Sequence, residues 1–263
     1  MFKINILGCG SSSGVPVLGC TCKVCLSILT KNKRMRSSIL ITIDNTNIII
    51  DTGPDFRQQI LNSKTHNIGH ALYTHTHSDH CLGIDDLRVC TIYQKKPIDI
   101  YATKKIIYDF QERFAFLFHA PKHINRPWQK LQSNIIQYNI PFMINDVTIY
   151  PFEQQHGTIS TTGFILKHNN IKIAYSTDIK LITTKTIEHL KSMYLDLWIV
   201  GYIGYHGSIA HASPNQIMEW IKIISPKQTV FTHMGDNVDY YQLSKNLHTG
   251  IQAGFDGMQI ILR

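Results

Sequence analysis

The segment THTHSDH, residues 74–80, places three histidines and an aspartate in six consecutive positions. Imidazole nitrogens and carboxylate oxygens are ligands for zinc, iron and manganese. In an extended chain alternate side chains point the same way, so His75 and His77 could bind one ion together. Asp79 and His80 follow where the strand ends and the chain turns, which would aim them at a second ion. A polar loop with merely exposed histidines is the alternative, but it gives no reason for this density of ligands.

An active site with two ions needs more ligands than this segment supplies, and we expect them at the same ends of other strands. Three residues meet that condition because each follows a predicted buried strand: His156 in EQQHG, Asp178 in YSTD and His233 in FTHMG. Together with the four residues above, they form a set of seven candidate metal ligands.

The elements that must position these ligands alternate between strands and helices along the whole chain. The expected strands are 2–7, 38–43, 48–50, 71–73, 97–102, 135–138, 147–152, 163–167, 171–176, 195–200, 228–231 and 258–262. The expected helices are 54–61, 104–116 and one that Ser213 caps and Pro214 begins. Such alternation, with hairpins opening each half, predicts an α/β fold of two mixed sheets with helices outside. We expect a four-layer αββα sandwich in a single domain, residues 1–263.

The segment FLFHAPKHINRPWQ, residues 116–129, contains prolines, histidines and aromatic residues without a clear period. We expect a long loop there, suited to a lid or a dimer contact.

Composition limits the class of protein. The content of hydrophobic residues is 43% and of charged residues 17%, which is ordinary for a globular chain. The apolar run 4–7 is too short for the core of a signal peptide, and no apolar stretch approaches the roughly 20 residues of a membrane span. We therefore expect a cytoplasmic protein without a membrane partner. The net charge of +8 favours phosphates or nucleic acid as partners, or serves solubility alone, and the dense basic run is KNKRMR, residues 31–36.

Three of the six cysteines lie in GCTCKVC, as Cys20, Cys22 and Cys25. In a cytosolic chain, cysteines clustered in this way bind metal more often than they form disulfides. The alternative is that they are ordinary buried cysteines. A structural zinc on three thiolates needs a fourth ligand.

The motifs IIIDTG, THTHSDHCLGI, QQHG, YSTD and FTHM occur in that order between residues 46 and 236 and resemble the five motifs of the metallo-β-lactamase superfamily. The resemblance implies an αββα fold and a hydrolase with two metal ions. It also implies a role for each matching residue. These are His75, His77 and His156 on the first ion, Asp79, His80 and His233 on the second, Asp178 bridging both, and Asp51 orienting ligands.

Two further segments resemble the phosphodiesterase subgroup typified by phosphoribosyl 1,2-cyclic phosphate phosphodiesterase. The opening LGCGSSSGVPVLGCTCKVC matches its start, which implies a structural zinc on the three cysteines and a homodimer. The subgroup's fourth zinc ligand is a histidine, whereas this chain has Asp236, a harder oxygen ligand. HGSIAHASPNQ, residues 206–216, matches a segment whose histidine protonates the leaving group. His211 takes that position here, and His206 is the rival.

These observations together predict hydrolysis of a small phosphodiester, a cyclic one in particular, by a hydroxide activated by two zinc or manganese ions. Asp79 would position the nucleophile and His211 would protonate the leaving oxygen. One alternative is an RNA-processing nuclease related to tRNA 3′-endonucleases, in which the basic run 31–36 would bind backbone phosphates. The other is a module that binds metal or nucleic acid without turnover.

Overall fold

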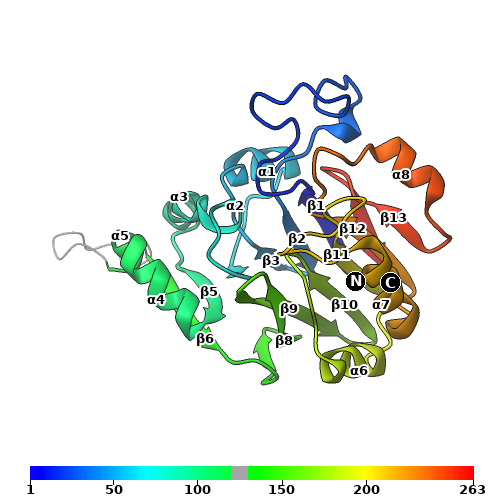
Figure 1. The fold of residues 1–263 in the computed structure, drawn as a ribbon. Coiled ribbons are helices and arrows are strands. Elements are labelled where there is room, and N and C mark those ends of the chain that lie inside the picture. The colour runs from blue at the N-terminus through cyan, green and yellow to red at the C-terminus, as the bar shows by residue number, and fades with distance from the viewer. Residues whose placement is uncertain (120–129) are drawn as a thin grey trace.

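The computed structural model describes residues 1–119 and 130–263, and two seven-stranded sheets form its centre (Figure 1). The first sheet has the order β14 (Gln259–Leu262), β1 (Phe2–Gly8), β2 (Ser38–Ile43), β3 (Thr46–Ile50), β4 (His70–Leu72), β5 (Ile98–Thr103) and β6 (Leu131–Ile136). The second has the order β13 (Ile251–Ala253), β12 (Gln228–Thr232), β11 (Leu197–Gly201), β10 (Ile171–Ser176), β9 (Ile159–His168), β8 (Val147–His156) and β7 (Phe142–Ile144).

Helices cover the outer face of each sheet. Those against the first sheet are α1 (Phe56–Ser63), α2 (Ser78–Cys81), α3 (Ile84–Gln94), α4 (Lys104–Arg113) and α5 (Ala115–Phe118). The second sheet has α6 (Thr184–Ser192) and α7 (Pro214–Ile224) on its outer face, and α8 (Tyr240–Asn246) lies at its β13 edge. The segment between β1 and β2, residues 9–37, projects at the top of Figure 1, and we call it the projecting segment. It contains a 3₁₀ turn, η1 (Thr30–Asn32). The predicted αββα sandwich is therefore confirmed.

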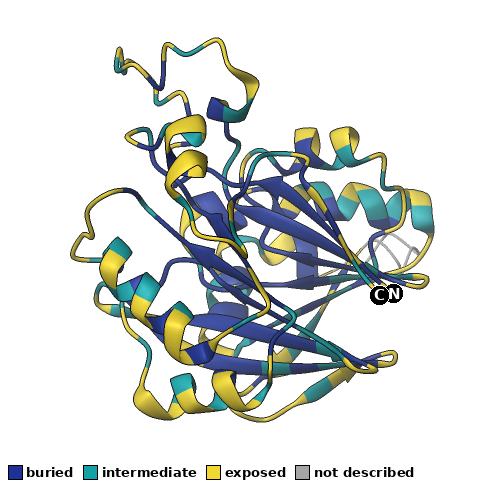
Figure 2. Cartoon of the chain, turned by 90° about the vertical axis from the view of Figure 1, so that its right-hand side faces the viewer, coloured by how far each residue is buried: buried dark blue, intermediate teal, exposed yellow. Residues whose placement is uncertain are grey.

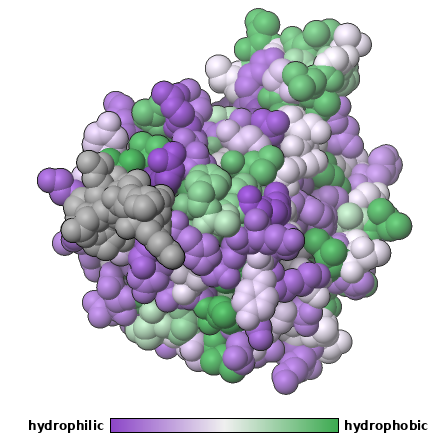
Figure 3. Space-filling view, turned by 90° about the vertical axis from the view of Figure 1, so that its left-hand side faces the viewer, coloured by the Kyte–Doolittle hydropathy of each residue, from purple (hydrophilic) through white to green (hydrophobic). Residues whose placement is uncertain are grey.

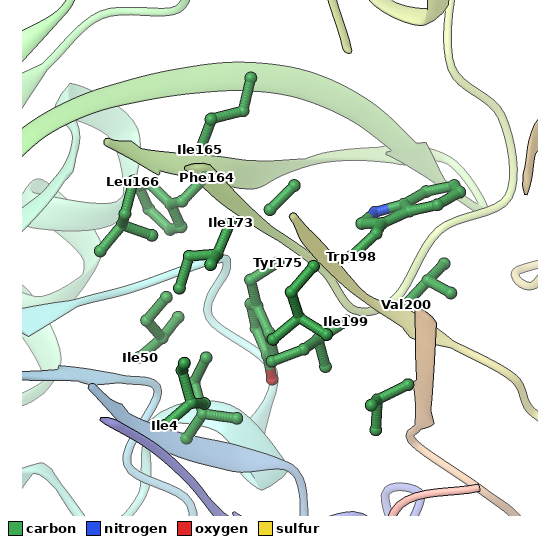
Figure 4. Close-up of a cluster of buried hydrophobic side chains, with 14 of the residues drawn as sticks. Ile4, Ile50, Phe164, Ile165, Leu166, Ile173, Tyr175, Trp198, Ile199 and Val200 are labelled. Carbon is green, nitrogen blue, oxygen red and sulfur yellow. The ribbon is translucent and has the colours of Figure 1, made fainter. Parts of the chain in front are cut away.

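The central strands β2, β3, β10 and β11 are largely apolar, as expected where both faces of a sheet are buried. In β2, Ile39 and Ile41 point toward the second sheet, whereas Leu40 between them packs under the helices. Figure 4 shows Ile4 and Ile50 of the first sheet facing aromatic and aliphatic side chains of the second. Figure 2 shows the result across the molecule, with buried strands between helices whose outer faces are exposed.

The surface on the left of Figure 1 is mostly hydrophilic, and its hydrophobic side chains form small separate groups (Figure 3). The projecting segment exposes more of them, including Leu18 at 96% and Ile28 at 93% of their full areas. Within residues 1–119 and 130–263, no helix is both long and apolar enough to cross a membrane.

Parallel pairing brings the ends of several strands to one edge of the sandwich. Strands β3, β4, β5 and β6 are parallel neighbours in the first sheet, and β10 to β13 are parallel neighbours in the second. The carboxyl ends of parallel strands meet at one edge, so the loops that follow them lie together. The Thr162 amide of β9 donates to the Thr74 carbonyl after β4 over 2.9 Å, which joins the two sheets at this edge.

Three local predictions need correction. The helix expected from Pro54 begins two residues later, at Phe56, because the Asp55 carboxylate accepts from the Arg36 backbone amide and pairs with its guanidinium. The strand before the histidine segment ends at Leu72 rather than Tyr73. His75 and His77 therefore lie beyond the strand, since the Thr74 amide donates to Asp51 Oδ1 instead of continuing the ladder.

Two longer predictions also change. The strand expected at 147–152 continues to the residue expected to follow it, so His156 is the last residue of β8. The strand expected at 135–138 lies earlier, as β6, where it pairs in parallel with β5. Of the segment 116–129 predicted as a loop or lid, the first residues belong to α5, and residues 120–129 lie outside the described part of the chain.

Candidate metal centre

The seven predicted ligands meet at the shared edge of the two sheets. Their nitrogen and oxygen atoms form overlapping groups in which all atoms lie within 4.8 Å of one another. The groups are His75, His77 and His156; Asp79, His80 and His233; His75, His80 and Asp178; and His156, Asp178 and His211. We call the seven residues without His211 the ligand cluster. Asp178 lies at its centre, with Oδ2 2.9 Å from His80 Nε2 and 3.2 Å from His233 Nε2, and Oδ1 3.4 Å from His156 Nε2.

Left-handed backbone turns at strand ends direct two of these side chains, and that of Asp51, inward. Asp51 after β3, Asp178 after β10 and His233 after β12 have φ angles of 64°, 47° and 56°. Residues other than glycine rarely adopt this region, and such strained residues concentrate at functional sites. The strain shows that the surrounding packing fixes where these side chains point.

Hydrogen bonds at Nδ1 set the tautomers of three histidines. His80 Nδ1–H donates to Asp51 Oδ2 over 2.7 Å, and His156 Nδ1–H donates to the Ala210 carbonyl over 2.8 Å. Thr74 donates its hydroxyl to Asp51 Oδ2 (2.8 Å), so it can accept from His75 Nδ1–H (2.9 Å). When neutral, each imidazole therefore directs an Nε2 lone pair at the cluster, the arrangement that metal-binding histidines use.

Buried nitrogens without partners provide a test of whether the cluster suits metal ions. Within the described residues, His75 Nε2, His80 Nε2 and both ring nitrogens of His233 are buried and form no hydrogen bond. His80 Nε2 is close to Asp178 Oδ2, but without hydrogen-bond geometry. Burying an unpaired polar atom costs free energy, so this convergence of lone pairs and carboxylates calls for a cation between them. The donor set of imidazoles and carboxylates fits divalent ions of the zinc and manganese type.

Metal uptake near pH 7 is expected to release about one proton or more per protein molecule. In the metal-free chain, burial alone would lower the pKa of His80, but the carboxylates of Asp178 and Asp51 outweigh burial and raise it well above its usual value. A ligand imidazole must be neutral, so this proton leaves when the ion binds. His75 contributes none, because burial lowers its pKa.

Calorimetric titration with Mn²⁺ in two buffers of different ionisation heat counts these protons, because Mn²⁺ suits the imidazoles and carboxylates better than the thiols of the cysteine site. The number should fall as the pH rises through the pKa of His80, because the metal-free chain then has no imidazolium proton to lose. Mn²⁺ binding without any proton release near pH 7 would contradict the assignment of His80 as a ligand.

His211 forms a possible ligand group with His156 and Asp178, but neither the group of His75, His77 and His156 nor that of Asp79, His80 and His233 needs it. Its Nε2 is 3.9 Å from Asp178 Oδ1, and its ring centre is 4.8 Å from that of His156. Burial lowers its pKa to about 4, against the opposing charge of Asp178. The rival His206 is exposed and belongs to none of the ligand groups found in the described residues.

A cavity of about 600 Å³ opens next to the ligand cluster and offers room for a substrate. His75 and Thr76 form one wall, and Lys104, Lys105 and Tyr138 lie among the residues of the others. The cavity beside the cluster therefore has two cationic side chains in its lining.

The structure also brings together the four residues of the predicted cysteine site, Cys20, Cys22, Cys25 and Asp236, whose ligand atoms lie within 4.8 Å of one another. The Cys20 thiol donates to Asp236 Oδ2 over 3.4 Å, and the Cys22 thiol to the Asp236 carbonyl over 3.5 Å. The backbone amide of Cys25 donates to Cys22 Sγ and lowers the pKa of that thiol. All four are positioned as expected for a zinc site, with Asp236 where the subgroup has histidine.

The cationic side chains of the basic run 31–36 bind other groups of the same chain. Arg34 is only 3% exposed. The contacts are Lys31 Nζ to Tyr240 Oη (3.1 Å), Lys33 Nζ to the Cys25 carbonyl (3.0 Å), Arg34 Nη2 to the Val238 carbonyl (2.7 Å) and Arg36 Nη1 to Asp55 Oδ1 (2.9 Å). The run ties the projecting segment to the body of the protein, so it is not a row of free cations for nucleic-acid phosphates.

The sequence motifs did not reveal three groups that support the cluster: the Thr74 hydroxyl, the Ala210 carbonyl and the Lys180 ammonium. Thr74 precedes His75 directly, so its position was a usable signal. Ala210 lies 54 residues along the chain from its partner His156, and Lys180 lies 28 residues from its partner Ser208. No local sequence pattern marks contacts at such separations.

Comparison with known proteins agrees with this geometry. Residues 46–234 match the model of the beta-lactamase superfamily domain. The structure superposes on a crystal structure described as a new diphosphatase from the PhnP family, with a TM-score of 0.89 and 26% identity over 100% of this chain and 98% of that one. It also superposes on Zn²⁺-bound PqqB from Methylobacterium extorquens, with a TM-score of 0.83 and 18% identity over 99% of this chain and 100% of the other, a likeness of fold alone.

A curated relative is the octanoyltransferase of Porphyromonas gingivalis, 33% identical over 98% of this chain. The chain spans about half of that relative, 51% of its length. The family match covers most of the chain, includes the ligand cluster, and agrees with the sandwich fold. The chain therefore belongs to the metallo-β-lactamase superfamily, and its structure resembles that of the PhnP-family diphosphatase.

Proposed function

We propose that this protein is a phosphodiesterase that uses two divalent ions, zinc or manganese, to hydrolyse a small phosphodiester, cyclic ones in particular. The observation that carries the proposal is His211, an imidazole that adjoins the ligand cluster without being required as a ligand. Hydrolysis of a phosphodiester expels an alkoxide, which needs a proton, and a histidine at this position can supply it.

The ligand cluster contains two groups of three ligands that share no residue, and each group would hold one ion. His75, His77 and His156 would hold the first ion, Asp79, His80 and His233 the second, and Asp178 would contact both. When bound, such a pair supplies a water nucleophile at neutral pH and neutralises charge on the phosphate oxygens. A zinc ion in the cysteine site would stabilise the fold and take no part in the reaction.

Asp79 would orient the attacking water as well as bind metal. Burial by itself would raise its pKa, yet the nearby imidazoles of His233 and His80, 3.6 and 3.1 Å from Oδ2, lower the pKa below its usual value. The carboxylate is thus ionised and can accept a hydrogen bond from water.

His211 would be neutral in the free protein, because burial depresses its pKa. A bound phosphate brings negative charge to the imidazole and acts in the same direction as Asp178, which raises the pKa. The proposal requires His211 to carry a proton in the substrate complex, where the leaving oxygen needs it.

Several observations support a small phosphate ester over the alternatives. The PhnP-family relative is described as a diphosphatase, so a phosphorus centre is the substrate of a protein with this fold and 26% identity. The nuclease alternative relied on the basic run 31–36, whose cations have internal partners. Half of the octanoyltransferase lies outside the matched region, so its named activity carries no argument about this cluster.

Metal removal and reloading tests the proposal. Protein stripped with a chelator is expected to be inactive, and two equivalents of Zn²⁺ or Mn²⁺ should restore hydrolysis of bis-p-nitrophenyl phosphate and of 2′,3′-cyclic AMP. Reloaded protein that hydrolyses neither compound would refute it. Preferential cleavage of single-stranded RNA over the cyclic nucleotide would favour the nuclease instead.

A further inference from the structure

The loop that carries His211, residues 203–213, runs between β11 and α7 without regular secondary structure. Within the described residues the His211 side chain accepts or donates no hydrogen bond, and its nearest ionic neighbour is Asp178 at 3.9 Å. A general acid must be held within a fraction of an ångström of its working position. The backbone of this loop must therefore supply the order that the side chain lacks.

Part of that order comes from a tight turn, residues 208–211. Ser208 Oγ accepts from the amides of Ala210 (3.2 Å) and His211 (3.0 Å), and the Ser208 amide donates to the His211 carbonyl (3.0 Å). The turn is thereby closed on itself, but these bonds do not fix its position relative to the ligand cluster.

Two contacts provide that connection: the Ala212 amide, directly after the turn, donates to the Ile179 carbonyl over 2.8 Å, and Lys180 holds the turn itself. Lys180 Nζ donates to the carbonyls at both ends of the turn, Ser208 over 2.6 Å and His211 over 3.3 Å. Its own amide donates to the Gln155 carbonyl over 2.6 Å, one residue before His156, and Lys180 lies two residues after Asp178. An ammonium donating to two carbonyls makes charge-assisted bonds, which are stronger than those of a neutral donor.

The same turn also touches the first metal position. The Ala210 carbonyl accepts from His156 Nδ1–H over 2.8 Å and so orients that imidazole. Movement of the turn would displace His211 and release His156 together.

We infer that Lys180 is a positioning residue that fixes the turn 208–211 against the ligand cluster, and so places both the acid His211 and the imidazole of His156. The part concerning the acid rests on the proposed phosphodiesterase function. The part concerning His156 predicts metal affinity and does not depend on the reaction.

Lys180→Met tests both parts, because methionine keeps most of the apolar stem and removes the donors. Turnover of 2′,3′-cyclic AMP at saturating metal is expected to fall about 10- to 100-fold, the usual effect of a lost partner behind a ligand. The loss should be at least about ten times smaller for bis-p-nitrophenyl phosphate, whose nitrophenolate leaves without a proton. Zn²⁺ affinity, measured by titration calorimetry of metal-free protein, should also fall about tenfold or more.

Two variants control for general damage. Lys180→Arg keeps a cationic donor and should recover much of both losses. Lys191→Met makes the same substitution at an exposed position of α6, where the side chain forms no hydrogen bond or ion pair with the described residues, and should leave turnover and Zn²⁺ affinity at wild-type values. In a His211→Ala background, Lys180→Met should cause no further loss with the cyclic nucleotide, because it acts through the missing acid.

The outcomes distinguish failure of the proposed phosphodiesterase function from failure of the proposed role of Lys180. Wild-type protein without phosphodiesterase activity refutes the proposed function, and the Zn²⁺ titration then judges Lys180 alone. Unchanged Zn²⁺ affinity and unchanged substrate preference in Lys180→Met overturn the inference. If Lys180→Met lowers the melting temperature of the metal-free protein, Lys180→Gln takes its place. That variant also removes the ammonium that donates to the Ser208 and His211 carbonyls, and it should reproduce the pattern; a wild-type pattern would overturn the inference as well.

Discussion

His77→Ala is expected to lose one of two bound ions and to reduce phosphodiester hydrolysis by about a thousandfold or more. A metal ion contributes several kcal/mol of transition-state stabilisation, and each 1.4 kcal/mol is roughly a factor of ten in rate. His77 is the exposed member of its ligand group, whereas His75 and His156 are buried. Its loss should therefore change the free energy of unfolding of the metal-free protein by no more than about 0.5 kcal/mol. Elemental analysis and steady-state rates on metal-loaded protein measure the two effects.

The matched control is His66→Ala, at an exposed histidine outside every ligand group found in the described residues. It should keep two ions and full activity. Two ions retained in His77→Ala, together with wild-type turnover, would remove the two-metal proposal.

His211→Ala is expected to separate substrates by their leaving groups. Loss of a general acid typically costs about 10²- to 10⁴-fold, and that cost should appear with 2′,3′-cyclic AMP, which expels a sugar alkoxide. Hydrolysis of bis-p-nitrophenyl phosphate should fall far less, since nitrophenolate is stable without a proton. Because His211 is not assigned as a ligand, the metal content should stay at the wild-type value.

His206→Ala is the control in this case, because it removes the rival histidine from the same loop. It should behave as wild type with both substrates. Equal losses on both substrates in His211→Ala, or a leaving-group effect in His206→Ala, would contradict the acid role of His211.

The sequence determined the fold and the seven candidate ligands because both leave local patterns. Buried strands appear as short apolar runs, and a ligand that follows a strand end is visible as a polar residue directly after such a run. Asp178 and His233 were found in this way, and His75 to His80 by their density. The same reasoning ended β4 one residue too late and β8 too early, because neither boundary depends on hydrophobicity. The Thr74 amide turns to Asp51, and β8 continues its ladder with β9 as far as His156.

Only the tertiary structure decided how the ligands are oriented and what surrounds them. The pairing of Asp51 with His80, the Ala210 carbonyl behind His156 and the hold of Lys180 on the turn 208–211 all join residues separated by 28 to 54 positions. The basic run 31–36 likewise suggested a surface for phosphates and instead ties the chain internally, Arg34 across 204 residues to Val238. The physical reason is that hydrophobic periodicity records only which face of an element is buried. The partner of a polar side chain is set by which strand ends the fold brings to one edge, and that depends on the pairing order of both sheets.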